Sequence, residues 1–544
     1  MKLVLIIVPT LAFFLFTSPS FAEGENNACG RAEPNQVPQG ATIGTVSIVR
    51  NQIFDTTKPE EDKLLYRFAN RYHVLTKDPT IRSQLLFGPG DEFDQRELQE
   101  SERLLRQNSY LYDADIYPTC VVGNVVDIEV VTRDVWTLTP GISISRAGGE
   151  NEFSLDINDS NLLGTGADLR FEYEDDLDRE SYAISFSDQQ LGSSRIFLGT
   201  LYSNNDDGHR AVLTAGRPFF ALNTRWSLTG TLVDDERIET LYELGDEVAD
   251  FRQDTTFISS QYGWSKGLKN GWVRRWTAGA VYDDRQFSDA VSTSLPGAVP
   301  EGRKLVYPFI GFQILQDKFE ESTNRDQIDR TEDLFLGSNF GATLGWSSEG
   351  FGAEQDAMVF NVNAGTSFGS QEKNLVTLNA RWNGRLQDDR LRNSVFSTNF
   401  RYYRNQSDKR LFFITVSGDW GHNLDLDNPI RLGGDTGLRG YPVRYQNGSS
   451  RALITVEQRY FTNWYPFRLF RVGAAVFADA GRTWGDNPVG GPSEGWLSDV
   501  GIGLRLGSTR VGSSRVVHID LAFPLDGDDS IDSVQLSVSG RRSF

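Results

Sequence analysis

Alternation of apolar and polar residues dominates the chain from Arg133 onward. In residues 167–174 the odd positions are apolar and the even positions are charged, and residues 376–383 and 517–523 repeat this period. A period of two indicates strands with one apolar face. A soluble sandwich would show the same period, but about twenty such segments are more than a sandwich needs. The pattern predicts a mainly β fold, with a transmembrane antiparallel β-barrel over residues 135–544.

Residues 41–134 follow a different pattern, in which short strands alternate with helical periods. The strand-like segments are residues 43–53, 114–121 and 125–131, and Leu64, Leu65, Phe68 and Tyr72 recur at helical spacing. Asp94 followed by Glu97 is typical of a capped helix start, and Leu98, Leu104 and Leu105 give that helix an apolar face. The order strand, helix, helix, strand, strand predicts a small α+β domain.

The amino terminus predicts export. Lys2, the apolar run from Leu3 to Phe16 and the small-residue end at Ala22 indicate a signal peptide over residues 1–22. Residues 23–40 are polar, contain Pro and Gly, and are typical of a linker. The run from Leu3 to Phe16 is shorter than a membrane-spanning helix needs, and no other stretch approaches 18 consecutive apolar residues, so we expect no such helix.

The composition agrees with an exported barrel. The chain contains 35 Phe, 18 Tyr and 11 Trp, and aromatic side chains form girdles at the two interfaces of membrane barrels. A formal net charge of −20 disfavours nucleic acid as a partner. Cys29 and Cys120 are compatible with one disulfide in an oxidising compartment, and the alternative is two unpaired cysteines.

Residues 433–442, Gly-Gly-Asp-Thr-Gly-Leu-Arg-Gly-Tyr-Pro, are the most informative segment, in a long loop at about residues 421–450. The single cation, Arg439, indicates an arginine fixed against carboxylates. Alternation places Glu457 and Asp479 on the lumen side of their strands, since the opposite register would expose a charge to lipid at a cost of about 2–4 kcal/mol. Alternatively, the arginine only rigidifies a plug.

The chain resembles the BamA/TamA superfamily, also called the bacterial surface antigen family, in a form with one POTRA domain. The resemblance rests on residues 87–93 (Phe-Gly-Pro-Gly-Asp-Glu-Phe), residues 161–166 (Asn-Leu-Leu-Gly-Thr-Gly), the Arg439-Gly440-Tyr441 loop, residues 477–481 (Phe-Ala-Asp-Ala-Gly) and the carboxy-terminal Phe544. It implies sixteen barrel strands, although the number of alternating segments allows up to twenty. It also implies a periplasmic POTRA domain at residues 41–134.

For the loop, the resemblance implies an ion pair of Arg439 with Glu457 and Asp479, with Gly440 and Tyr441 at the tip. Phe544 would be the barrel's carboxy-terminal recognition signal. First and last strands, near residues 141–145 and 534–540, would pair weakly and leave a lateral seam.

The function implied by the resemblance is insertion or translocation of other polypeptides at the outer membrane of a Gram-negative-type cell. The POTRA domain would receive unfolded clients by strand addition. A dedicated two-partner-type secretion pore is one alternative, and a passive channel or structural protein is another, of a different class. The implied partners are outer-membrane lipid and unfolded polypeptides, with room for accessory periplasmic proteins but no nucleic acid.

Motifs for catalysis, metal binding or cofactor binding are not evident. The four histidines, at positions 73, 209, 422 and 518, lack the spacing of metal ligands. Residues 263–267, Gly-Trp-Ser-Lys-Gly, match a hydrolase nucleophile elbow, but that motif needs a helix after the serine and a strand is expected here. We therefore expect no enzymatic activity, no metal and no cofactor.

Overall fold

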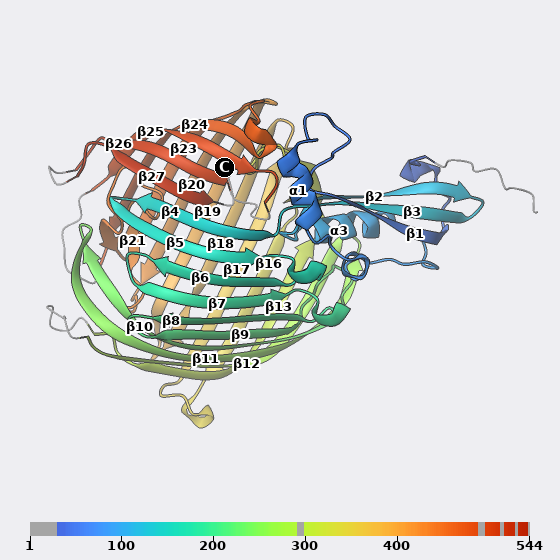
Figure 1. Cartoon of the computed structure of the whole chain (residues 1–544). Coiled ribbons are helices and arrows are strands. Elements are labelled where there is room, and N and C mark those ends of the chain that lie inside the picture. The colour runs from blue at the N-terminus through green and yellow to red at the C-terminus, as the bar shows by residue number, and fades with distance from the viewer. Residues whose placement is uncertain (1–29, 291–298, 488–494, 512–515, 528–530, 542–544) are drawn as a thin grey trace, which may run out of the picture.

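The computed structural model describes residues 30–290, 299–487, 495–511, 516–527 and 531–541. It consists of a closed β-barrel with a small α+β unit against one of its ends (Figure 1). We call this end the near end and the opposite one the far end. Among the described residues, no helix has the length and apolar character needed to cross a membrane.

The barrel contains twenty antiparallel strands within the described part of the chain. They are β4 (Leu138–Ala147), β5 (Glu150–Asp159), β6 (Asp168–Asp175), β7 (Glu180–Asp188), β8 (Phe197–Asn205), β9 (His209–Arg217), β10 (Trp226–Glu243), β11 (Asp246–Lys269), β12 (Trp272–Asp289), β13 (Arg303–Gln316), β16 (Asn339–Ser347), β17 (Ala357–Gly369), β18 (Asn374–Gln387), β19 (Arg390–Ser407), β20 (Arg410–His422), β23 (Ser450–Phe461), β24 (Phe470–Trp484), β25 (Leu497–Ser508), β26 (Val516–Pro524) and β27 (Gln535–Arg541). Each strand pairs with its neighbour along the chain, and β27 closes the barrel on β4.

The strand number is the upper limit of the predicted range, and the expected sixteen was too low. Fifteen described barrel strands precede the long loop and five follow it, which matches the number of alternating segments in the sequence. The segments in excess of sixteen are wall strands, because each has an apolar outer face and a hydrogen-bonded neighbour on both sides. Two further hairpins, β14 (Phe319–Ser322) with β15 (Glu332–Phe335) and β21 (Ile430–Leu432) with β22 (Gln446–Gly448), lie in connections between wall strands.

The outer face of the wall is apolar. Large side chains that face outward include Leu228, Ile258, Trp276, Ile310, Leu344, Trp382, Phe396, Trp420, Ile502 and Phe523, all of which are exposed. Charged side chains on the same strands face the lumen and are buried there, as Asp479 and Asp520 are. A continuous apolar surface of this extent is unfavourable in water, and it has the polarity of a wall that faces lipid.

The α+β unit precedes the barrel. Its elements are β1 (Thr42–Asn51), α1 (Leu64–Tyr72), α2 (Asp78–Arg82), α3 (Gln95–Arg106), β2 (Leu111–Val122) and β3 (Val125–Asp134), after a short 3-10 helix at Pro34–Gln36. Strand β3 lies in the centre of the sheet, parallel to β1 and antiparallel to β2. Helix α2 and the short 3-10 helix are elements that the sequence pattern did not predict.

Helix α3 shows why this sequence folds as predicted here. The Asp94 carboxylate accepts a hydrogen bond from the Arg96 amide at 2.9 Å, so the predicted helix cap is confirmed. Leu98 and Leu105 are fully buried against the sheet, where they meet Ile128 and Val130 of β3. The apolar face of α3 therefore forms one side of the core of the unit.

Several polar contacts fix the unit to the near end of the barrel. Arg106 of α3 forms a two-pronged ion pair with Asp333 of β15, at 2.9 and 2.7 Å. Glu100 accepts a hydrogen bond from the Leu222 amide in the β9–β10 connection. Contacts of this kind orient the unit relative to the strands that it precedes.

Glu102 of α3 gives the unit a pH dependence. Burial raises the pKa of Glu102 to about 7 from an ordinary 4.5, although the Ile116 amide donates to its carboxylate at 2.6 Å and opposes the shift. The folded unit therefore binds more protons than the unfolded chain between these two values. Its stability falls as the pH rises through this window.

We predict that Glu102→Gln stabilises α3 and β2 at about pH 8 by on the order of 2 kcal/mol and flattens the pH dependence. Hydrogen-exchange protection of the Ile116 amide, corrected for intrinsic exchange and compared at about pH 5 and about pH 8, measures this. Glu92→Gln, an exposed change in the same unit, is the control. Equal pH slopes in wild type and Glu102→Gln would contradict the assignment.

Candidate functional site: a loop fixed inside the barrel

The connection between β20 and β23 folds back into the barrel from the far end. We call residues 423–449 the lumen loop. Its ends are tied together by the pairing of β21 with β22. Leu432, Leu438 and Tyr441 of the loop are buried in an apolar cluster with Leu453 and Leu497 of the wall. The loop is therefore part of the packed interior.

Arg439 lies at the centre of a buried charge cluster. Its Nε and Nη2 atoms donate to the two carboxylate oxygens of Asp479 at 2.8 and 3.0 Å. Its Nη1 donates to Glu457 at 3.0 Å and to Asp520 at 3.3 Å. The guanidinium also stacks on the Phe477 ring, with its Cζ 3.3 Å from the ring centroid. The structure thus brings the three predicted site residues together, and adds Asp520.

Two further arginines complete the cluster. Arg459 donates to the second oxygen of Glu457 at 2.9 Å, and Arg505 pairs with Asp520. Both are buried inside the barrel. Glu457 and Asp520 each contact more than one arginine, and Asp479 is held by Arg439, so removal of Arg439 weakens the compensation of three buried charges.

The sequence contained a signal for these missed residues. Asp520 alternates with apolar residues in the segment 517–523, and this alternation turns it to the same side of the strand as His518. Arg505 of β25 lies opposite His518 of β26, so its side chain faces the same side of the wall as those of His518 and Asp520. The sequence shows which side of its strand each residue faces. It does not show which residues of different strands lie at the same level in the barrel, because that depends on the register between strands.

The loop tip contacts the wall through its backbone and one hydroxyl. The Gly440 amide donates to Asp499 at 2.9 Å, and a Cβ at Gly440 would lie 2.7 Å from the Asp499 Cβ, so only glycine fits. The Tyr441 hydroxyl donates to the Ser498 carbonyl at 2.8 Å. Residues 439–441 therefore touch the four consecutive strands β23 to β26.

The opposite side of the lumen loop contacts the first barrel strands. Arg444 forms a two-pronged ion pair with Asp178 in the β6–β7 turn, with both distances 2.7 Å. The β4–β5 turn packs against the loop backbone, because a Cβ at Gly148 would lie 2.2 Å from the Val443 nitrogen. The loop therefore bridges the two sides of the β27–β4 junction from inside the barrel.

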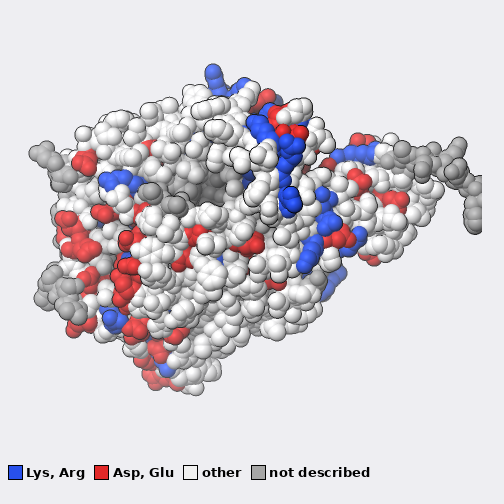
Figure 2. Space-filling model, in the orientation of Figure 1, with Lys and Arg blue, Asp and Glu red and all other residues white. Residues whose placement is uncertain are grey.

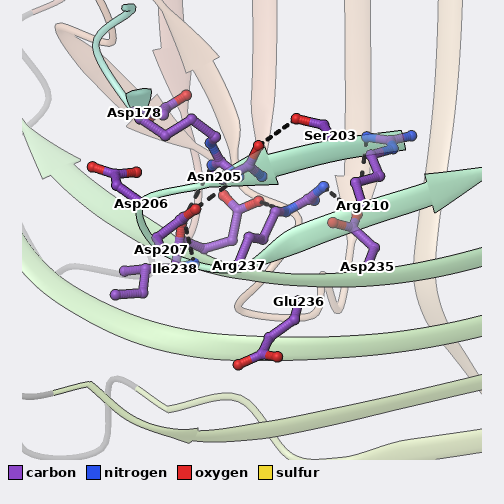
Figure 3. A network of polar contacts seen from close by, with 12 residues as sticks. Asp178, Ser203, Asn205, Asp206, Asp207, Arg210, Asp235, Glu236, Arg237 and Ile238 are labelled. Atoms are coloured by element: carbon purple, nitrogen blue, oxygen red, sulfur yellow. Dashed lines mark hydrogen bonds and ion pairs between the residues drawn. The ribbon is translucent and has the colours of Figure 1, made fainter. Parts of the chain in front are cut away.

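The wall near Asp178 carries a network of charges (Figure 3). Asp207 accepts a hydrogen bond from the Ile238 amide at 2.8 Å, and Arg237 pairs with Asp235 at 2.7 Å. These side chains come from β10 and the β8–β9 turn beside Asp178 (Figure 3). The carboxylate that holds Arg444 thus stands in a polar part of the wall that is rich in charged side chains.

The start of the lumen loop is anchored to a third part of the wall. Arg303 of β13 donates to both carboxylate oxygens of Asp427 at 2.9 and 2.6 Å. Arg385 of β18 does the same to Asp425, with both distances 2.7 Å. The loop is thus held at three places around the barrel.

A second connection enters the lumen from the near end. The β14–β15 hairpin places Ile328 in an apolar cluster with Tyr403, Phe413 and Val516 of the wall. The Arg325 carbonyl accepts a hydrogen bond from Arg459 at 3.0 Å, so this hairpin meets the Arg439 cluster. Arg106 of α3 holds the same hairpin through Asp333, which links the α+β unit to the lumen.

A polar cavity of about 490 Å³ remains along the wall from β11 to β19. Arg285, Tyr307, Asn361, Asn383 and Arg385 are among its lining residues. Within the described ranges, no group of three or more His, Cys, Asp or Glu side chains is arranged to hold a metal ion.

The remaining predicted positions are distributed as follows. Phe544, Cys29 and residues 1–22 lie outside the described residues, so the barrel signal, the bridge to Cys120 of β2 and the signal peptide stay predictions. Ser265 lies within β11, where its hydroxyl donates to the Arg274 carbonyl at 2.8 Å.

Comparison with known proteins gives distant likenesses. No protein-family model matches the chain. The chain is similar to BamA from Haemophilus ducreyi lacking POTRA domains 1–3 (13% identity, 91% of this chain and 84% of that one, TM-score 0.42). It is also similar to CdiB from Acinetobacter baumannii (13%, 92% and 73%, TM-score 0.45) and CdiB from Escherichia coli (12%, 96% and 92%, TM-score 0.38). Likenesses of this size carry no conclusion about function.

We predict that Arg439→Ala destabilises the folded barrel by about 3–5 kcal/mol, because three buried carboxylates lose their shared cation. Arg439→Lys retains the charge without the two-pronged geometry and should have an intermediate effect. Denaturant midpoints of the purified protein, followed by the heat-dependent electrophoretic shift of barrels, measure the loss.

Arg381→Ala, which removes an exposed arginine of β18, is the matched control and should change stability by less than about 0.5 kcal/mol. An Arg439→Ala midpoint equal to that of the control would show that the cluster does not hold the loop.

Proposed function

We propose that this protein resides in the outer membrane of a Gram-negative-type cell and inserts or translocates other polypeptides, without catalysing a chemical reaction. The closed barrel with an apolar outer face supports a membrane location. In this proposal the α+β unit is a POTRA domain, the near end is periplasmic and the far end is extracellular.

The β27–β4 junction is the observation that carries the proposal. Strands β26 and β27 are aligned at seven positions, whereas among the described residues β27 and β4 are aligned at one, Val538 opposite Arg146. Backbone groups without partners are costly in lipid, so a weakly paired junction favours the entry of another strand. A client strand would pair with the edge of β27 or β4 and thereby reach the membrane.

The lumen loop would act as a latch for this junction. Arg439 fixes the loop to β23, β24 and β26, while Arg444 fixes it to Asp178 on the other side. With both attachments made, the two sides of the junction are held at a fixed separation. Release of either attachment would weaken this bridge across the junction, where the β27–β4 pairing itself is short.

The α+β unit would receive clients at a sheet edge. Strands β1 and β2 are the two edges of its three-stranded sheet. An extended polypeptide can add to such an edge through main-chain hydrogen bonds. The contacts of Arg106 with the β14–β15 hairpin would then couple the client-binding unit to the lumen.

A dedicated secretion pore for one partner is the second candidate. The polar cavity along β11 to β19 favours it, because a translocated chain needs a wet path through the barrel. A passive channel without clients would use the same path, and appreciable conductance without a client phenotype would favour that function.

Quantitative proteomics of the outer membrane and the medium after depletion of the protein separates these functions. We expect loss of many unrelated β-barrels from the membrane, because insertion serves clients in general. Loss of one exported protein with the barrels intact would instead identify a dedicated pore. An unchanged membrane and medium would contradict both transport functions.

Cross-linking tests the junction itself. We predict that a disulfide between Val538→Cys and Arg146→Cys abolishes client insertion, and that a reductant restores it, because the junction must open. Leu504→Cys with Ile519→Cys, an aligned pair of the neighbouring strands β25 and β26, is the control and should leave insertion unchanged. Full activity of the oxidised 538–146 pair would exclude a role for the junction.

A further inference from the structure

We infer that helix α1 is a membrane-surface anchor, whose apolar stripe inserts into the lipid leaflet around the near end of the barrel. The inference rests on the membrane location given under the proposed function. It adds a second lipid contact, made by the unit that precedes the barrel.

Helix α1 exposes its apolar side chains. Leu64, Phe68 and Tyr72 lie four residues apart on one stripe and are 79%, 56% and 61% exposed. Leu65, beside this stripe, is 75% exposed. An apolar helical face normally packs on a core, so a face that is exposed along the whole helix is available to a partner.

The opposite face of α1 fixes its orientation. Tyr66 stacks on Phe54, with ring centroids 4.2 Å apart. Asn70 donates to the Phe54 carbonyl and accepts from the Phe54 amide, at 2.8 and 3.1 Å. His73 contacts Asp134 at 3.0 Å. These contacts hold the apolar stripe on the outside of the unit.

A basic stripe runs beside the apolar one. Lys63, Arg67 and Arg71 are also four residues apart, and all three are exposed. Figure 2 shows this group of positive side chains over α1, next to the barrel. An apolar stripe flanked by Lys and Arg is the pattern of a helix that lies in a membrane surface with anionic headgroups.

The exposed apolar surface continues from α1 onto the barrel wall. The Tyr66 hydroxyl donates to the Phe467 carbonyl at 2.6 Å, in the β23–β24 turn. Phe467 and Trp464 of this turn are 76% and 64% exposed, and Tyr460 and Phe470 at the adjoining strand ends face outward. The apolar surface of the wall therefore continues to α1 across this turn, beside the exposed ion pair of Arg468 with Glu60.

This continuity selects lipid over an unfolded polypeptide as the occupant. A polypeptide groove would be bounded by the unit on both sides, whereas α1 contacts the β23–β24 turn of the barrel, where Trp464 and Phe467 are exposed. The aromatic residues Trp464, Phe467 and Tyr72 are of the type that gathers at membrane interfaces. The anchor also holds the unit beside Trp136, the residue packed against Tyr66 just before β4.

Photo-cross-linking of the full chain reconstituted in bilayers of phosphatidylglycerol and phosphatidylcholine tests the anchor. A benzophenone amino acid replaces Phe68, a conservative change at an exposed position. In the control it replaces Val122, which is exposed at the end of β2 that points away from the barrel (Figure 1). We expect on the order of tenfold more lipid adduct at position 68 than at position 122.

The same probe at Ile310, on the outer face of β13, separates this inference from the proposed location. Lipid adducts at 310 but not at 68 would overturn the anchor and leave the location intact, and no adduct at 310 would overturn the location itself. With an unfolded barrel polypeptide added, adducts of position 68 to that polypeptide in place of lipid would identify a client-docking face and overturn the anchor.

The basic stripe has its own readout. Arg67→Ser with Arg71→Ser should lower the lipid adduct at position 68 severalfold in the anionic bilayers and leave it unchanged in pure phosphatidylcholine. If the double variant gave the same adduct yield as the unsubstituted protein in the anionic bilayers too, these arginines would not engage headgroups.

Discussion

The sharing of Arg439 among carboxylates of three strands is the interaction on which the interior of this barrel depends. Glu457, Asp479 and Asp520 all lie within ion-pair distance of Arg439, and without this loop cation the three acids would face only Arg459 and Arg505. The cluster therefore makes the lumen loop a condition for stable closure of this part of the wall. Together with the ion pairs of Asp425 and Asp427, this attachment positions the loop against Asp178 and Gly148 across the junction.

Alternation made part of this site predictable, and its limits are physical. Alternation along their strands places Glu457 and Asp479 on the face opposite the apolar side chains. Because the apolar face of the wall is the outer one, the two acids face the lumen. Alternation does not give the strand register, so the participation of Asp520 and of Arg505 depended on how β24, β25 and β26 are aligned with one another. The partner of Arg444 was unpredictable for the same reason, because Asp178 lies 266 residues away in a turn.

The strand number and helix α1 illustrate two different limits. About twenty segments showed alternation in the sequence, and sixteen strands were expected only because the resemblance implied that number. In α1 the helical spacing of Leu64, Phe68 and Tyr72 predicted the helix correctly, but the buried contact is made by Tyr66 on the other face. A period identifies a stripe and does not say whether protein or lipid covers it.

The central claim is that the lumen loop holds the two sides of the junction together. Spin labels at Glu150 and Leu525, which flank the junction at the far end, allow the separation to be measured by pulsed electron resonance in bilayers. We expect one narrow distance distribution in the wild type and a broad, longer one in Arg439→Ala. The same narrow distribution in both proteins would contradict the claim, because the junction would then be closed without the loop.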